Sequence, residues 1–319
     1  MKSGVEPLVN DGFAGEPAKR CVGYVQSQRE KGKNVVGIYC TYGPLEVVRA
    51  AGAVPAVLCA FADKTIAAAE EDLPANLCPL IKSSYGFIKT DTCPFYSLAD
   101  VVIGETTCDG KKKMFELIAG IKPTHVMDLP QLPDQKEALE NWTEMVKKLK
   151  GFLETTLKTQ ISDEAVEAEI QHSNVKNKLL NTILDFAALT PTPLTWQEMY
   201  DLTYLGQAAS TADMMKVMED ALAKVQKRVA DGVFHGQPDS PRVLVTGTPV
   251  GGDATKVFKI IEESGGVIVA LDLCTGLKPY AGHIEDGAAD PYRAISKRYL
   301  EIPCARSEEH TSELQSRQS

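Results

Sequence analysis

The sequence has none of the features of a membrane, secreted or nucleic-acid-binding protein. No run of apolar residues reaches the about 20 that a membrane-spanning helix needs, and the polar start, MKSGVEPLVNDGFAGEP, lacks the apolar core of a signal peptide. Basic residues are outnumbered, since 34 lysines and arginines stand against 43 acidic residues and give a formal charge of −9. Phosphate backbones and anionic lipids favour positively charged proteins. We therefore expect a cytoplasmic protein that binds no nucleic acid and no membrane.

Local cysteine motifs are also absent, although cysteine itself is plentiful. None of the eight cysteines forms a CxxC pair, which excludes the zinc-ribbon and thioredoxin spacings. A disulfide framework is not expected in a cytosolic chain of 319 residues. Cysteine is often buried as a small apolar residue, and we interpret Cys21, Cys59 and Cys274 in this way. A structural role is also favoured for Cys93, which lies in a turn-like Thr-Cys-Pro sequence.

The first part of the chain alternates between short apolar strands and helices. The β-branched composition and the flanking turn formers predict strands at 34–40, 54–59, 100–104 and 126–129. Helices are predicted between them, at 44–51, 64–69, 79–85 and 111–119. Gly86 is expected to break the third helix, and Asp109 to cap the fourth. A strand, a helix and a strand within about 30 residues form the parallel βαβ unit.

The rest of the chain divides into a helical region and a second alternating region. Apolar residues recur at helical spacing from 136 to 231, and a linker-like composition follows. A strand at 242–246, a helix at 254–264 and a strand at 267–271 come next. The loop 247–253 lacks the Walker and GxGxxG patterns and is predicted to be a tight turn. We predict an α/β protein with a first α/β domain at 1–134, a helical region and linker at 135–240, and the start of a second α/β domain at 241–305.

The last residues differ from everything before them. Residues 306–316, RSEEHTSELQS, resemble the in-frame translation of a sequencing-library adapter and share no apolar periodicity with the preceding chain. We therefore leave 306–319 out of the fold prediction. We expect the gene to be cut off after Ala305, so that the second α/β domain is incomplete. A disordered polar terminus is the alternative interpretation.

Three cysteines fall at the edge where open parallel sheets bind ligands, beyond the carboxyl ends of the strands. Cys40 ends a predicted strand, whereas Cys78 and Cys108 each lie at the start of a predicted helix. The positive end of a helix stabilises a thiolate, and Lys82 and Lys111 add positive charge nearby. From these residues alone, a cluster or metal site and a set of buried structural cysteines both remain open. Thiolates would select an iron–sulfur cluster, zinc or Cu(I).

Two carboxylates close to these cysteines in the sequence are candidate catalytic groups. Glu46 and Glu105 could relay protons in a reductive reaction. Glu46 has a second explanation as an exposed partner of a helix dipole, because it lies at the start of a predicted helix. Glu105 follows directly on a buried strand.

Three segments of the sequence resemble one enzyme family. These segments are CTYGPLEVVRAAGAVPAVL at 40–58, LPANLCPLIKSSYG at 73–86 and GETTCDGKKKMFE at 104–116. They are similar to the signature of 2-hydroxyacyl-CoA dehydratase and benzoyl-CoA reductase subunits, and most similar to the branch called double-cubane cluster proteins. The resemblance implies two flavodoxin-like α/β domains with a helical region between them. It also implies an iron–sulfur cluster, either a 4Fe-4S cubane or a bridged 8Fe-9S double cubane.

The resemblance further implies which residues hold the cluster. Cys78 and Cys108 match two of the three family ligands, and the third would lie in a motif after residue 305. Cys40 is a candidate for a fourth ligand or a supporting role. Three further residues near these cysteines are candidates for cofactor binding, namely Lys82, Ser83 and Lys111.

These expectations lead to three functional hypotheses. The first is a homodimeric double-cubane reductase that acts on a small-molecule substrate and receives electrons from an ATP-hydrolysing iron–sulfur activator protein. The second is one subunit of a 4Fe-4S 2-hydroxyacyl-CoA dehydratase, a radical lyase that pairs with a paralogous subunit. The third is a non-catalytic cluster carrier or a zinc-stabilised protein.

Overall fold

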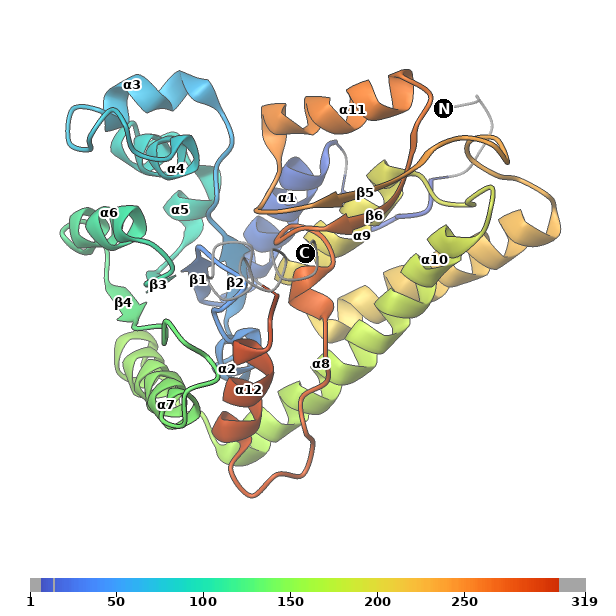
Figure 1. The fold of residues 1–319 in the computed structure, drawn as a ribbon. Helices are drawn as coiled ribbons and strands as arrows, with labels where there is room; N and C mark the ends of the chain where they lie inside the picture. The colour runs from blue at the N-terminus through green and yellow to red at the C-terminus, as the bar shows by residue number, and fades with distance from the viewer. Residues whose placement is uncertain (1–6, 14, 304–319) are drawn as a thin grey trace.

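The computed structural model describes residues 7–13 and 15–303, and it has the α/β architecture that the sequence predicts (Figure 1). A four-stranded parallel sheet forms in the first part of the chain, and a two-stranded parallel sheet forms near its other end. Helices surround both sheets. Cys304 and the adapter-like residues 306–316 lie outside the described residues.

Three neighbouring strands of the four-stranded sheet, β1, β2 and β3, are buried on both faces because they carry apolar side chains in both directions, whereas the edge strand β4 is partly exposed. Its strands lie in the order β2-β1-β3-β4 and are all parallel. In β3, Val102 packs into one core cluster, whereas Val101 and Ile103 pack into another. Such two-sided burial is typical of parallel sheets, whose crossover helices cover both faces. The strand bounds are β1 Val35–Ile38, β2 Val54–Val57, β3 Val101–Glu105 and β4 Thr124–Met127.

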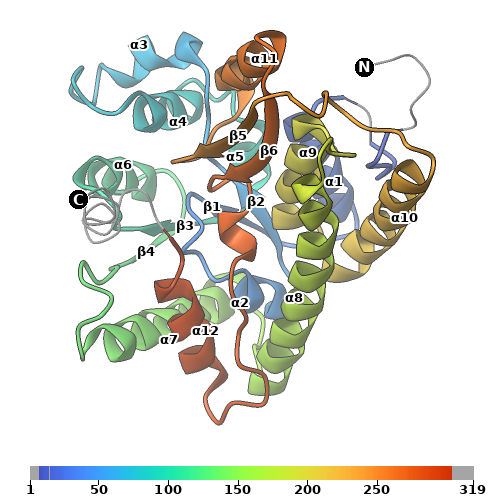
Figure 2. The same ribbon diagram turned by 45° about the vertical axis from the view of Figure 1, so that its right-hand side comes forward.

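The helices divide between the two faces of this sheet (Figures 1 and 2). The face with Val102 is covered by α1 (Pro17–Glu30), α4 (Pro79–Lys89), α5 (Pro94–Leu98), α6 (Asp109–Ala119) and α9 (Trp196–Ala208). The opposite face is covered by α2 (Leu45–Ala50), α7 (Ala138–Leu157), α12 (Pro291–Leu300) and the first half of α8 (Asp163–Leu184). A 3-10 turn at Asp63–Thr65 and the short helix α3 (Ile66–Ala69) precede α4.

The region between the sheets is helical, as predicted. Helices α8 and α10 (Thr211–Ala230) pack on each other. The second sheet consists of β5 (Arg242–Thr246) and β6 (Val267–Asp272), with α11 (Lys256–Glu263) between them in the chain. No helix within the described ranges is both long enough and apolar enough to cross a membrane. The exact limits of the domains stay a prediction.

The structure contradicts the expectation that Gly86 breaks a helix. Helix α4 continues through Gly86 to Lys89. A Cβ atom at Gly86 would overlap the carbonyl oxygen of Thr65. The glycine therefore permits close packing of α4 on the preceding turn, and it does not mark a helix end.

We expect Gly86→Ala to destabilise the protein by about 1–3 kcal/mol, because the added methyl group meets backbone that must move. Gly151→Ala in α7 is the matched control, since a Cβ there would meet no atom within 4 Å. In an exposed helix, alanine is favoured over glycine by about 0.5–1 kcal/mol. Urea unfolding of both variants measures the difference. Equal stability of the two variants would contradict the packing role of Gly86.

The stability of the folded protein is expected to depend on pH through His235. Nε2 of His235, in the linker before β5, lies 3.0 Å from Oε1 of Glu262 in α11, and this hydrogen bond raises the pKa of His235 despite partial burial. The folded protein then binds this proton more tightly than the unfolded chain. The pair contributes stability below the ordinary histidine pKa of 6.5 and loses it as the pH rises through the raised value.

We therefore expect His235→Gln to cost more stability at about pH 6 than at about pH 8. Urea unfolding at the two pH values provides the measurement. His283→Gln is the control, because His283 pairs with Asp286 but its side chain is 66% exposed. A cost for His235→Gln that is the same at both pH values would refute the expectation.

Candidate functional site

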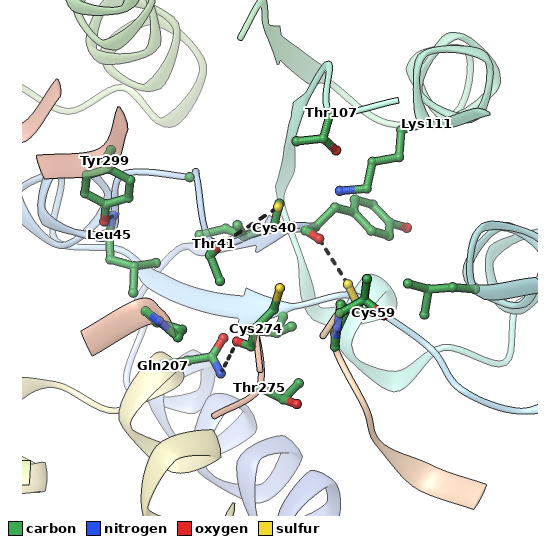
Figure 3. Close-up of a pocket in the computed structure, with 18 residues that line it drawn as sticks. Cys40, Thr41, Leu45, Cys59, Thr107, Lys111, Gln207, Cys274, Thr275 and Tyr299 are labelled. Carbon is green, nitrogen blue, oxygen red and sulfur yellow. Dashed lines mark hydrogen bonds between the residues drawn. The ribbon is translucent and has the colours of Figure 1, made fainter. Parts of the chain in front are cut away.

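A cavity lies at the carboxyl edge of the four-stranded sheet, facing the end of β6 (Figure 3). The cavity volume is about 60 Å³, and the cavity is partly open to solvent. Three cysteines reach its wall from just beyond the end of a strand: Cys40 after β1, Cys59 after β2 and Cys274 after β6. Much of the remaining wall is apolar and includes Ile38, Leu45, Val57, Leu80, Pro249 and Pro279.

Lys111 of α6 is the one charged side chain among the cavity-lining residues that the structure describes, and it is 6% exposed. Its ammonium group donates a hydrogen bond to Oε1 of Glu105, the last residue of β3, which is fully buried. Oε1 also accepts a hydrogen bond from Thr107 at 3.3 Å, whereas Oε2 has no hydrogen-bond partner in the described chain. Burial alone would lower the pKa of Lys111, but Cys40 and Glu105 raise it above its usual value. Lys111 therefore remains protonated.

Two of the cavity thiols have well-defined surroundings. The Cys59 thiol donates to the carbonyl oxygen of Tyr39 at 3.0 Å. Burial raises the pKa of Cys59 to about 11, although Lys111 acts in the opposite direction. Cys59 therefore stays a thiol near neutral pH. Sγ of Cys40 lies 3.9 Å from the hydroxyl oxygen of Thr41.

Tyr299 of α12 forms the cavity wall on the side away from Lys111 (Figure 3). Its hydroxyl donates to Oε2 of Glu46 at 2.8 Å and accepts from the backbone N–H of Leu45 at 3.0 Å. Burial raises the pKa of Tyr299, so the phenol keeps its proton. Glu46 is only 4% exposed, which corrects its interpretation as an exposed partner of a helix dipole. Glu46 does not line the cavity, but it is hydrogen-bonded to Tyr299, which does.

Three basic side chains lie behind this wall. Nη2 of Arg49 donates to carbonyl oxygens at the end of α9, and Nζ of Lys176 donates to one of them at 3.1 Å. Arg298 donates to two carbonyl oxygens, including that of a proline in the cavity wall. Burial and then the charge of Arg49 lower the pKa of Lys176 well below its usual value, while Glu46 acts in the opposite direction. Arg49 and Arg298 thus place two guanidinium groups behind the wall.

Cys78 and Cys108 lie outside the cavity wall, at the N-caps of α4 and α6. This corrects the expectation that Asp109 is the cap of α6, because Asp109 is its first helical residue. Both cysteines are half-buried, and neither sulfur accepts a hydrogen bond from its helix. Cys93 at the start of α5 differs, since its sulfur accepts from the N–H of Tyr96 at 3.3 Å.

The starts of α4 and α6 pack on each other. A Cβ atom at Gly110, in the first turn of α6, would lie 2.8 Å from a methyl group of Leu77, the residue before Cys78. Only glycine permits this approach without displacing Leu77. Leu80 of α4 and Thr107, which precedes α6, both line the cavity. The two helix starts therefore lie beside the cavity.

The structure brings the remaining predicted residues into other contacts. Nζ of Lys82 lies 2.5 Å from Oε1 of Glu70, and the Ser83 hydroxyl donates to the carbonyl oxygen of Ala62 at 2.8 Å. Cofactor binding by Lys82 and Ser83 stays a prediction. Within residues 7–13 and 15–303, no three His, Cys, Asp or Glu side chains are placed to hold a metal. A site at Cys78 and Cys108 therefore needs a ligand from elsewhere.

Sequence reasoning misses four residues of the cavity wall. Cys59 and Cys274 are half-buried and line the cavity, so their interpretation as buried apolar residues is incomplete. Each follows a predicted strand, which is the same signal that identified Cys40. Gln207, whose side-chain amide donates to the carbonyl oxygen of Cys274 at 3.4 Å, and Tyr299 have no such local signal. They come from helices far along the chain.

Comparison with known proteins now identifies the family. The family model described as 2-hydroxyglutaryl-CoA dehydratase, D-component, matches residues 40–318. The protein named "Putative dehydratase subunit YjiM" of Escherichia coli (strain K12) is 39% identical over 283 residues, 88% of this chain and 73% of that protein. The beta subunit of lactoyl-CoA dehydratase from Anaerotignum propionicum is 26% identical over 86% of this chain and 70% of its own length. A benzoyl-CoA reductase subunit of Thauera aromatica is 21% identical over 86% and 69%.

The chain therefore belongs to the 2-hydroxyglutaryl-CoA dehydratase D-component family. Its relatives have the names of dehydratase and reductase subunits, which agrees with the resemblance found in the sequence. The chain is a dehydratase-like or reductase-like enzyme subunit.

We expect Lys111→Met to destabilise the protein by about 3–5 kcal/mol, because it leaves the buried Glu105 carboxylate without a cation. The double variant Glu105→Gln, Lys111→Met removes both charges and should recover most of the loss. Lys113→Met is the matched control on the same helix, since Lys113 forms an exposed ion pair with Glu116. Its effect should stay within about 0.5 kcal/mol. Urea unfolding that shows equal stability for Lys111→Met and Lys113→Met would refute the role of the buried pair.

Proposed function

We propose that the chain is an iron–sulfur cluster-binding subunit of a dehydratase or reductase that acts next to the cavity. The placement of Cys78 and Cys108 carries the proposal. Both cysteines lie at helix starts that pack together, and neither sulfur is used to cap its helix. Family membership supports the same function, because relatives of this chain are named for reactions of CoA thioesters.

The chemistry of the donor set fits such a cluster. The N-terminal end of a helix is positively polarised, which stabilises a thiolate and an anionic cluster. Half-burial leaves each sulfur accessible while limiting contact with water. The family resemblance implies that a third cysteine follows residue 305. When bound, the cluster would supply one-electron transfer at low potential.

The protein's own residues would then position the substrate and hold protons. The apolar side chains of Leu45, Val57 and Leu80 would contact the hydrocarbon part of a substrate. We propose that Glu105 and Glu46 act as proton-holding groups, because each contacts the cavity through one side chain. Lys111 makes that connection for Glu105, and Tyr299 makes it for Glu46.

Two assemblies are consistent with this chemistry. In the first, two copies of the chain share a bridged 8Fe-9S double cubane and receive electrons from an ATP-hydrolysing iron–sulfur activator. In the second, the chain holds one 4Fe-4S cubane and pairs with a paralogous subunit. The two relatives that are named as single subunits of CoA-dependent enzymes, a dehydratase and a reductase, favour the second assembly.

The cysteine assignment can be tested by counting iron. The full-length protein would be expressed anaerobically and reconstituted with ferrous iron and sulfide. Cys78→Ala and Cys108→Ala should each lose most of the bound iron and of the visible sulfur-to-iron absorption. Cys93→Ala is the matched control, because Cys93 also precedes a proline at a helix start but its sulfur serves as a cap. This variant should keep its iron.

The possible outcomes separate the hypotheses. Full iron in both variants would refute the site. Zinc in place of iron would support a zinc-stabilised protein instead. An identical-subunit dimer with more sulfide than iron would support the double cubane, whereas a chain that assembles its cubane only with a paralogous partner would support the dehydratase.

A further inference from the structure

We propose that the cavity binds a small carboxylate, with the carboxylate on the Lys111 ammonium group and a short apolar tail against the opposite wall. The inference depends on the proposed function only in taking this cavity as the substrate site. Carboxylate binding itself needs no cluster, so it can fail or succeed separately from the cysteine assignment.

The hydrogen bonding of Lys111 provides the first argument. An ammonium group has three N–H donors. In the described part of the chain, Glu105 is the only hydrogen-bond partner of the Lys111 ammonium group, so two of its donors remain for a ligand. Glu105 does not line the cavity, whereas Lys111 does. A ligand in the cavity therefore meets the ammonium group and not its carboxylate partner.

The charge of the wall provides the second argument. No carboxylate is among the cavity-lining residues that the structure describes, although the whole chain has a formal charge of −9. On the far side, the guanidinium groups of Arg49 and Arg298 lie behind the wall and lower the pKa of Lys176 together with its burial. Glu46 offsets part of this charge. In a poorly solvated space, such an arrangement favours an anion over a neutral or cationic ligand.

The shape and polarity of the rest of the wall indicate the kind of anion. Ile38, Leu45, Val57 and Leu80 provide apolar contact, and one lysine provides the charge. A multiply charged ligand such as phosphate would leave charge unpaired against these side chains. A monocarboxylate with a short hydrocarbon tail matches both parts of the cavity.

The test compares butanoate with butanamide, which has nearly the same shape but no charge. Binding of each compound to the full chain would be measured by isothermal titration calorimetry without iron or sulfide. We expect saturable binding of butanoate and about tenfold or weaker binding of butanamide, because a charge-assisted hydrogen bond is lost.

Three variants locate the binding. Lys111→Met should weaken butanoate binding by about tenfold or more. Lys113→Met, the exposed control on the same helix, should leave the dissociation constant unchanged. Glu105→Gln should tighten butanoate binding, because it removes the negative charge behind Lys111 but keeps an oxygen for its hydrogen bond. This variant also keeps the test decisive if Lys111→Met does not fold.

Three results would overturn the proposal. The first is an absence of saturable butanoate binding, and the second is equal binding of butanamide. The third is a dissociation constant that changes in neither Lys111→Met nor Glu105→Gln.

Discussion

Burial of both faces of β1, β2 and β3 in the four-stranded parallel sheet is the constraint on which the candidate site depends. Parallel strands that are covered on both sides must be joined by helices, so all the strands end at one edge of the sheet. Cys40, Cys59 and Glu105 lie at or just after the ends of β1, β2 and β3, and α4 and α6 begin at the same edge. Residues that are far apart in the sequence therefore meet around one cavity without any local motif.

The buried pair of Lys111 and Glu105 is costly within this arrangement. Removing two charges from water opposes folding, and the mutual attraction of a buried pair often does no more than offset that cost. Here the carboxylate has one oxygen without a hydrogen-bond partner in the described chain, and the ammonium group faces a cavity. Stability alone does not explain such a pair. A ligand that uses the remaining donors of Lys111 does explain it.

The strand pattern and the helix starts could be predicted because their signals are local. The strand at 242–246 is found at its predicted position. Pro79 correctly indicated the start of α4 immediately after Cys78. The role of Gly86 could not be predicted, since it depends on the carbonyl oxygen of Thr65, which the preceding 3-10 turn places against α4. A sequence pattern does not show whether a glycine ends a helix or permits close packing.

The wall residues could not be predicted for a related reason. Tyr299 and Gln207 belong to helices whose apolar periodicity gives the buried side but not the neighbour that each side chain meets. The burial of Glu46 has the same origin, because α12 covers it and provides the phenol that donates to it. Polar groups that are buried in this way require partners, and those partners come from distant segments. The sequence could therefore indicate the edge of the sheet at which chemistry occurs, while the charge and shape of the cavity required the tertiary structure.

Leu80 and Thr107 connect the cavity with the proposed cluster site at Cys78 and Cys108. Each lies within two residues of a proposed cluster ligand, and each also lines the cavity. A group held by Cys78 and Cys108 would therefore lie at helix starts that also contribute to the cavity wall. Such a group, when bound, would supply an electron, and the Lys111 ammonium group in the cavity wall would stabilise negative charge on the ligand. The start of α6 thus holds both Cys108 and Lys111, and Gly110 between them lets this start pack closely on Leu77, next to the start of α4.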